Sequence, residues 1–141
     1  MGTPSTEDWI KINDLFTRYA TALDHGDVET LLGCFTEDAE VDSPIMGSFK
    51  GRAAIRDFAG RNAALRKSGA QMRHFVSNVR MDVNGDRARA GCYLLNTLTK
   101  DGTTELVSPG EYDCRLVKID GAWLFEYRLV TLDRPAVIPG R

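Results

Sequence analysis

Few side chains in this sequence are suited to catalysis, and Asp24 and His74 form the pair that chemistry favours. His74 lies in a stretch of alternating polar and apolar residues that is typical of a strand. Asp24 lies near the end of a predicted helix, where a carboxylate opposes the helix dipole and is expected to have a partner. A carboxylate that accepts a hydrogen bond from one imidazole nitrogen fixes the tautomer and stabilises the imidazolium. We therefore expect His74 to act as a general base oriented by Asp24.

Tyr19 and Arg128 are the next candidates for a catalytic role. Tyr19 lies on the apolar stripe of the same predicted helix, where it is either a core aromatic or a donor to a developing oxyanion or leaving group. Arg128 is predicted on the strand face opposite Trp123 and Phe125. It is there either a surface cation paired with Glu126 or a pocket residue that binds an oxygen.

The candidate substrate contacts are Asn78, Tyr112, Asn96 and Phe16. Strand alternation puts Asn78 on the same face as His74, and this face is the more polar one. The pattern leaves two alternatives open, because such a face either meets solvent or lines a wet pocket. His25, the second histidine, sits at the end of the predicted helix, where an exposed histidine is favourable beside the dipole.

Motifs for cofactors and metals are missing from the sequence. No glycine-rich phosphate loop follows a predicted strand, and there is neither a serine nucleophile elbow nor an HExxH pair. Cys34, Cys92 and Cys114 are far apart and resemble neither a zinc site nor a redox pair, so we expect buried free thiols in a reducing cytoplasm. The sequence thus predicts no cofactor and no metal.

The first half of the chain is predicted to be helical. Ser5 and Asp8 resemble a capping box before an amphipathic stripe that runs from Trp9 to Leu23, and Gly26 is a natural stop. Asp27 can cap a short second helix that extends to Phe35. A broken strand is expected over 38–50, interrupted by proline and glycine, followed by a third helix over 52–67.

The second half is predicted to be an antiparallel meander. Residues 71–83, 87–100, 104–119 and 122–132 are rich in β-branched and aromatic residues, and Asn-Gly or Asp-Gly pairs at 84–85, 101–102 and 120–121 separate them. Helices followed by a meander favour an α+β fold in which the helices pack in the concave face of a curved sheet. Such a cone would enclose a small-molecule pocket.

Composition limits the class of protein. The 141 residues fit one domain over 1–141, and 43% hydrophobic with 27% charged residues is ordinary for a globular protein. A net charge of −2 without a basic stripe argues against nucleic-acid binding.

The sequence shows no signal peptide and no run of the roughly 20 apolar residues that cross a bilayer, so we expect a cytoplasmic protein. Two prolines in residues 134–141 exclude a regular helix there and favour a frayed tail or a cover for the pocket mouth.

Several stretches resemble the SnoaL-like branch of the nuclear-transport-factor-2-like (NTF2-like) superfamily, over roughly Glu7 to Asp133. The matching segments are YATALDHGD from Tyr19, FTEDA from Phe35, FKG from Phe49, His74 with Asn78, and DGAW from Asp120. Within the superfamily the pattern is similar to cofactor-free lyases, namely bile-acid 7α-dehydratase, hexachlorocyclohexane dehydrochlorinase and scytalone dehydratase.

The resemblance implies an Asp–His dyad at Asp24 and His74 and a last-strand arginine at Arg128. The dehydrochlorinase has a lysine where this chain has Tyr19 and the bile-acid enzyme has a tyrosine, which favours loss of water over loss of halide. Scytalone dehydratase uses a second histidine on a later strand, and this chain has none there. Relatives are commonly dimers or trimers, so a homo-oligomer is expected.

We therefore expect a cofactor-independent lyase that eliminates water from a hydrophobic cyclic small molecule. An isomerase or cyclase acting on a steroid- or polyketide-like substrate is the first alternative, because the fold does not choose the reaction. A non-catalytic binding protein with the same pocket, and an assembly role with a vestigial pocket, are the others.

Overall fold

The computed structural model describes residues 2–134, so the expectations for the C-terminal segment lie outside the described residues from position 135 on. Helix α1 spans Thr6–His25, and it begins where Ser5 Oγ accepts a hydrogen bond of 3.1 Å from the Asp8 N–H. It ends at Gly26, whose φ of 69° lies in the left-handed region that glycine adopts without strain. Both predicted ends of this helix are confirmed.

Helix α2 spans Val28–Leu32 and is capped by Asp27, which accepts from the Thr30 N–H at 3.1 Å. The prediction that α2 extends to Phe35 is wrong, because Phe35 is the first residue of a strand. Helix α3 spans Arg52–Lys67, as predicted.

The strands form one six-stranded sheet with the order β2-β1-β6-β5-β4-β3. Their bounds are β1 Phe35–Ser43, β2 Gly47–Lys50, β3 Gln71–Asn84, β4 Arg87–Lys100, β5 Thr103–Ile119 and β6 Ala122–Leu132. The predicted meander is present as β3 to β6. The broken strand expected over 38–50 is the β1–β2 hairpin, and β1 runs parallel to β6, a pairing that no turn signal predicts.

Two of the three predicted hairpin turns have the expected geometry. Both residues of Asp101-Gly102 and of Asp120-Gly121 have positive φ, as a two-residue type I′ turn requires. The first turn lies one residue later than predicted, since Asn84 pairs with Arg87 and the loop is Gly85-Asp86.

Two of the four register shifts in the sheet affect predicted site residues by changing which side chains face its concave side. In β3 the pairing shifts between Ser77 and Arg80, where Asn78 has a φ of 55°. In β6, Tyr127 pairs with Arg115 and Phe125 with Leu116, so Glu126 is the extra residue. A bulge of this kind reverses the alternation beyond it.

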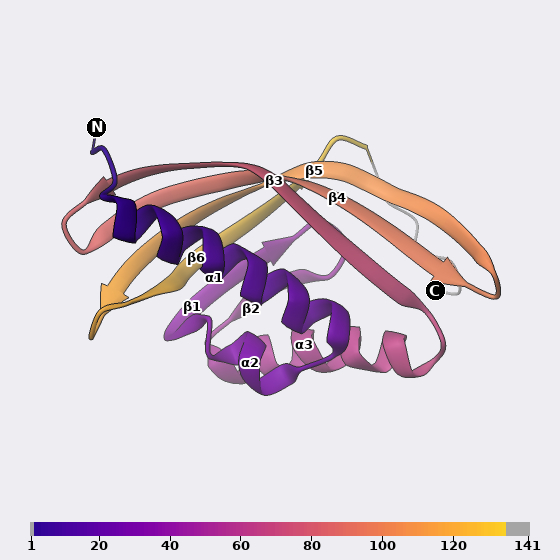
Figure 1. Cartoon of the computed structure of the whole chain (residues 1–141). Helices are drawn as coiled ribbons and strands as arrows, with labels where there is room; N and C mark the ends of the chain where they lie inside the picture. The colour runs from indigo at the N-terminus through magenta and orange to yellow at the C-terminus, as the bar shows by residue number, and fades with distance from the viewer. Residues whose placement is uncertain (1, 135–141) are drawn as a thin grey trace.

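Figure 1 shows α1 lying across the concave side of the curved sheet, with α2 and α3 continuing the helical layer beside β1 and β2. Most of the buried apolar side chains lie between these two layers and form one core. The predicted α+β fold, with helices packed in the concave face of a curved sheet, is confirmed, but the parallel β1–β6 pair makes the sheet mixed instead of purely antiparallel.

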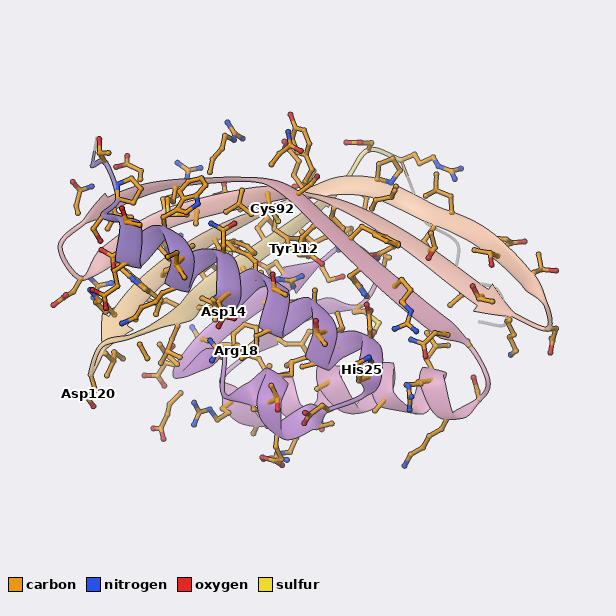
Figure 2. The ribbon with its side chains drawn as sticks, viewed as in Figure 1. Asp14, Arg18, His25, Cys92, Tyr112 and Asp120 are labelled. Atoms are coloured by element: carbon orange, nitrogen blue, oxygen red, sulfur yellow. The ribbon has the colours of Figure 1, made fainter. Side chains whose placement is uncertain are left out.

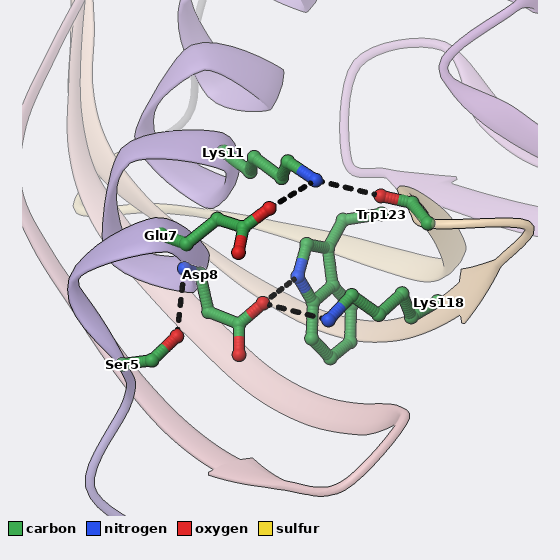
Figure 3. Close-up of polar contacts among 7 residues, drawn as sticks. Ser5, Glu7, Asp8, Lys11, Lys118 and Trp123 are labelled. Atoms are coloured by element: carbon green, nitrogen blue, oxygen red, sulfur yellow. Dashed lines mark hydrogen bonds and ion pairs between the residues drawn. The ribbon is translucent and has the colours of Figure 1, made fainter.

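The N-terminal end of α1 is fixed to the β5–β6 hairpin (Figure 3). Asp8 Oδ1 accepts a hydrogen bond of 2.8 Å from the Trp123 indole and lies 3.1 Å from Lys118 Nζ. Lys11 Nζ donates to the Gly121 carbonyl at 3.1 Å. These contacts set the direction in which α1 crosses the sheet, and thereby where its far end meets β3.

Candidate active site

Asp24 at the C-terminal end of α1 meets His74 of β3 in the interior. Asp24 Oδ1 lies 2.5 Å from His74 Nδ1, and Asp24 Oδ2 accepts from the His74 backbone N–H at 2.9 Å. The exposed fractions of the His74 and Asp24 side chains are only 6% and 8%. With Nδ1 donating to the carboxylate, Nε2 is the free acceptor of the neutral ring, which is the arrangement that a general base needs.

Gln71 fixes the helix end that carries this carboxylate. Its Nε2 donates to the Asp24 carbonyl at 2.9 Å and to the Met72 carbonyl at 2.8 Å. The last carbonyls of a helix lack partners within it, so the Gln71 amide replaces water at that position. Gln71 was not among the predicted site residues. A glutamine at the start of a strand has no sequence signal that separates it from a surface residue.

Arg128 lies fully inside, with its guanidinium between two tyrosine rings. The distance from its Cζ is 4.1 Å to the Tyr19 ring centroid and 3.8 Å to that of Tyr112. Stacking of this kind stabilises a cation away from water. The Nε and Nη1 groups of Arg128 are buried, yet they have no hydrogen-bond partner among the residues that the structure describes.

The position of Arg128 corrects the sequence-based assignment of its strand face. Arg128 was predicted opposite Trp123 and Phe125, yet all three are buried on the concave side because of the bulge at Glu126. Glu126 pairs with Arg87 instead of with Arg128. The alternative of a surface cation at Arg128 is therefore wrong.

The Tyr19 side chain is fully buried, and its hydroxyl has no hydrogen-bond partner within residues 2–134. Burial raises the pKa of Tyr19 to about 12, an effect that the nearby Arg128 charge partly offsets. The hydroxyl is therefore protonated near neutral pH and can donate to a ligand. Burial likewise raises the pKa of Tyr112, which Figure 2 places between α1 and the sheet.

These groups line one small interior cavity of about 50 Å³. Its polar walls come from Tyr19, His74, Asn96, Tyr112 and Arg128. The remaining walls come from α1, α3, the β1–β2 turn and the apolar face of the sheet: Leu23, Ser43, Ile45, Met46, Phe58, Asn62, Met72, Leu94, Val130 and Leu132. Five of the polar side chains therefore come from α1 and the sheet, and the remaining walls are mostly apolar, with Ser43 and Asn62 as the exceptions.

Two predicted substrate contacts do not lie at this cavity. Asn78 is exposed, because the bulge at this residue ends the alternation that put it on the His74 face. Phe16 is buried in the aromatic core against Phe125, with ring centroids 5.4 Å apart, and it is not a cavity residue. His25 is exposed at the end of α1 (Figure 2), as expected for a helix-terminal histidine.

Sequence reasoning also missed the residues that close the cavity. Ile45 and Met46 belong to the β1–β2 turn, where Ser43 Oγ accepts from both of their backbone N–H groups, at 3.3 and 3.2 Å. The only signal was the apolar Ile45-Met46 pair beside Pro44 in a turn, since turns are usually polar. Asn62 of α3 completes this wall.

Across the described part of the chain the structure has no cluster of three or more histidine, cysteine, aspartate or glutamate side chains arranged for a metal ion. All three cysteines are free and buried. In the same residues, no helix combines the length and apolarity needed to span a membrane.

Solved structures resemble this chain along most of its length. An NTF2-like protein with a cystatin-like fold from Novosphingobium aromaticivorans has a TM-score of 0.81 and 27% identity, covering 92% of this chain and 84% of that one. A candidate scytalone dehydratase from the same organism has a TM-score of 0.78 and 25% identity, covering 94% and 93%. The architecture is thus that of the cystatin-like, NTF2-like class.

Sequence similarity identifies the family to which this chain belongs. A single-residue variant of Rv3472, a protein of unknown function from Mycobacterium tuberculosis, is 31% identical over 94% of this chain and 78% of that one, with a TM-score of 0.81. No curated protein sequence matches the chain. The model of the SnoaL-like domain matches residues 4–128, and the chain belongs to this family.

Proposed function

We propose that this protein is a cofactor-independent lyase that eliminates water from a hydrophobic, cyclic hydroxy-carbonyl compound. The observation that carries the proposal is the 2.5 Å contact between Asp24 Oδ1 and His74 Nδ1 at the wall of the interior cavity. A buried carboxylate bonded to one ring nitrogen leaves the other free to take a proton. Similarity to a candidate scytalone dehydratase supports the same reaction class.

In the proposed reaction, His74 Nε2 removes a proton from the carbon next to the carbonyl group. The electron pair of that C–H bond forms an enolate, whose oxygen receives hydrogen bonds from the open N–H groups of Arg128. The enolate then expels the hydroxyl group from the neighbouring carbon, and a C=C bond forms. His74 then returns its proton to the departing oxygen, to which the Tyr19 hydroxyl donates a hydrogen bond. Water leaves, the ring is neutral again, and no oxidant or reductant is needed.

The cavity must widen when a substrate binds. Its volume of about 50 Å³ is well below the roughly 300 Å³ at which small-molecule pockets begin. Met46 and Met72 line it, and the unbranched methionine side chain changes rotamer readily. The proposal therefore includes displacement of the wall formed by Ile45, Met46 and Met72.

A direct test uses 3-hydroxycyclohexanone, a minimal cyclic β-hydroxy ketone. The proposal predicts its conversion to 2-cyclohexenone, followed by the ultraviolet absorbance of the conjugated product. His74→Ala should lower the rate of conversion about 10²–10⁴-fold while circular dichroism shows an intact fold. Equal rates for the wild type and His74→Ala would contradict the proposed base.

Isomerisation or cyclisation is the second candidate reaction, because it needs no group beyond those that elimination uses. The same groups, His74 Nε2 and the donors of Arg128, suffice to move a proton between two carbons of a ketone through an enolate. Deuterium incorporation from heavy water into cyclohexanone, without loss of water from the hydroxylated probe, would select this alternative. Binding of cyclohexanone without exchange would select a non-catalytic binding protein.

We also propose that the protein works in the cytoplasm as a dimer or trimer. Its three buried free thiols fit a reducing compartment. The outer face of the sheet carries four exposed large apolar side chains, Phe75, Tyr93, Leu95 and Leu106. Exposed apolar surface of this kind marks an interaction site, and a second copy of the chain is the expected occupant.

A further inference from the structure

Asn96 combines burial, an unpaired polar atom and a position beside the proposed base. It lies on β4 directly opposite His74 in the antiparallel register, and it lines the same cavity. Opposed side chains on one face have their Cβ atoms about 5 Å apart. Only 5% of Asn96 is exposed, and its Oδ1 has no hydrogen-bond partner anywhere in the described chain.

The unpaired atom is an acceptor, which separates it from the other open groups of the cavity. Arg128 Nε and Nη1 are donors only, and the Tyr19 hydroxyl also has a proton to donate. In the neutral His74 ring that the proposed base requires, Nδ1 donates to Asp24 and Nε2 is an acceptor. The cavity thus presents acceptors at His74 and Asn96 and donors at Arg128 and Tyr19.

A buried acceptor without a donor destabilises the empty protein, and a ligand that supplies the donor removes that cost. A site built around such a group rejects analogues that lack the matching hydroxyl. We infer that Asn96 is a specificity-determining residue, whose carboxamide oxygen accepts a hydrogen bond from a hydroxyl group of the substrate while the substrate carbonyl oxygen faces Arg128. This deepens the proposed function and rests on it for the location of the bound substrate.

The experiment compares the binding of 4-hydroxycyclohexanone with that of cyclohexanone. In the first compound the hydroxyl carbon is not adjacent to the acidic carbons, so binding is measured without elimination. Titrations of isotope-labelled wild-type protein, followed by NMR, should show about tenfold tighter binding of the hydroxylated compound, the ratio that one satisfied buried acceptor provides. Asn96→Leu should reduce this ratio to one or below.

Asn13→Leu is the matched control, because Asn13 lies on α1, its Nδ2 donates to the Trp9 carbonyl, and it does not line the cavity. This variant should keep the wild-type ratio. A ratio of one in the wild type, an unchanged ratio in Asn96→Leu, or no binding of either compound would overturn the inference. In His74→Ala the ratio should persist, so a failure of the proposed base is distinguishable from a failure of Asn96.

A second measurement requires no ligand. Because Asn96→Leu replaces an unpaired buried acceptor with apolar surface, its melting temperature should equal or exceed that of the wild type. A lower melting temperature, or a failure to fold, would mean that the carboxamide is satisfied within the protein and would overturn the inference.

Discussion

The Asp24 carboxylate binds His74 twice, through the ring Nδ1 and through the backbone N–H, at 2.5 and 2.9 Å. One residue of α1 therefore fixes both the strand position and the orientation of the imidazole. Rotation of the ring would break one bond, whereas displacement of the strand would break both. The geometry of the proposed base thus depends on how α1 is seated on the sheet.

Asp24→Asn and His74→Ala should each lower turnover by about 10²–10⁴-fold, the contribution of a positioned general base. The asparagine oxygen can still accept a hydrogen bond from one N–H group. The asparagine side chain has no negative charge, however, so it cannot hold the imidazole in the required tautomer as the carboxylate does. Steady-state kinetics on 3-hydroxycyclohexanone measure the effect. Asp14→Asn, which changes an exposed carboxylate of the same helix, is the control and should retain full activity. Full activity of Asp24→Asn would remove the dyad from the mechanism.

Arg128→Met should change activity and stability in opposite directions. Turnover should fall about 10²–10³-fold, because the proposed enolate loses its donors. Thermal stability should be maintained or increased, because a buried charge with open donors is replaced by apolar atoms of similar shape. Arg115→Met is the control, since Arg115 stacks on Tyr127 at the surface. A strongly destabilised Arg128→Met would contradict the absence of partners at Arg128 Nε and Nη1.

Tyr19→Phe should reduce turnover without reducing stability at neutral pH, since the hydroxyl has no partner to lose among the described residues. The raised pKa of Tyr19, about 12, adds an alkaline signature. The stabilising effect of keeping this hydroxyl protonated is complete below pH 10, the ordinary pKa of tyrosine, and is lost as pH rises towards 12. Between those limits, urea unfolding should show that the wild type loses more stability than Tyr19→Phe. Parallel declines would contradict the assignment.

Sequence patterns predicted the elements better than the directions of their side chains. Ser5, Gly26 and the Asp-Gly turns act locally, so their outcomes follow from neighbouring residues alone. Asn78 occupies a bulge and Arg128 follows one, so alternation assigned both residues to the wrong face of the sheet. A bulge depends on how a strand pairs with its partner, so the alternation of residues along a single strand does not predict it. The Asp24–His74 proximity was predictable because both residues gave chemical reasons for a partner.

The contacts of Asp8, at the N-terminal end of α1, should make the free energy of unfolding depend on pH in the acid range. The pKa of Asp8 is lowered, chiefly by the Trp123 indole hydrogen bond and further by Lys118 and Ser5. Its ionised form therefore stabilises the fold above its ordinary pKa of 3.8, and this contribution is lost as pH falls below that value. Asp8→Asn should be less stable than the wild type at neutral pH, and the difference should shrink once the pH falls below 3.8. Urea unfolding at the two pH values measures it, and a constant difference would contradict the titration of Asp8.

Trp123→Phe tests the same contact without changing charge. Loss of the indole N–H should cost about 1.5–3 kcal/mol in the free energy of unfolding, because the bond is to a carboxylate. Trp9→Phe, at a tryptophan that is 45% exposed, should be nearly neutral. Chemical denaturation of both variants measures the difference, and equal losses would argue against a specific Asp8–Trp123 bond.

The assembly state tests the apolar outer face of the sheet. Light scattering should report a dimer or trimer for the wild type, and Phe75→Asp combined with Leu106→Asp should give a monomer. Ile10→Asp, at the exposed Ile10 of α1, should leave the assembly unchanged. A monomeric wild type would contradict the proposed oligomer without affecting the proposed chemistry.

The extra residue at Asn78 divides β3 into two segments of opposite phase. Before it, even-numbered positions such as His74 and Val76 face inward, and after it the odd-numbered Val79, Met81 and Val83 do. Protein engineers can therefore vary the residues around His74 while the Met81 end continues to hold the hydrophobic core. Deletion of Asn78 would turn the inward-facing side chains of one of the two β3 segments away from α1.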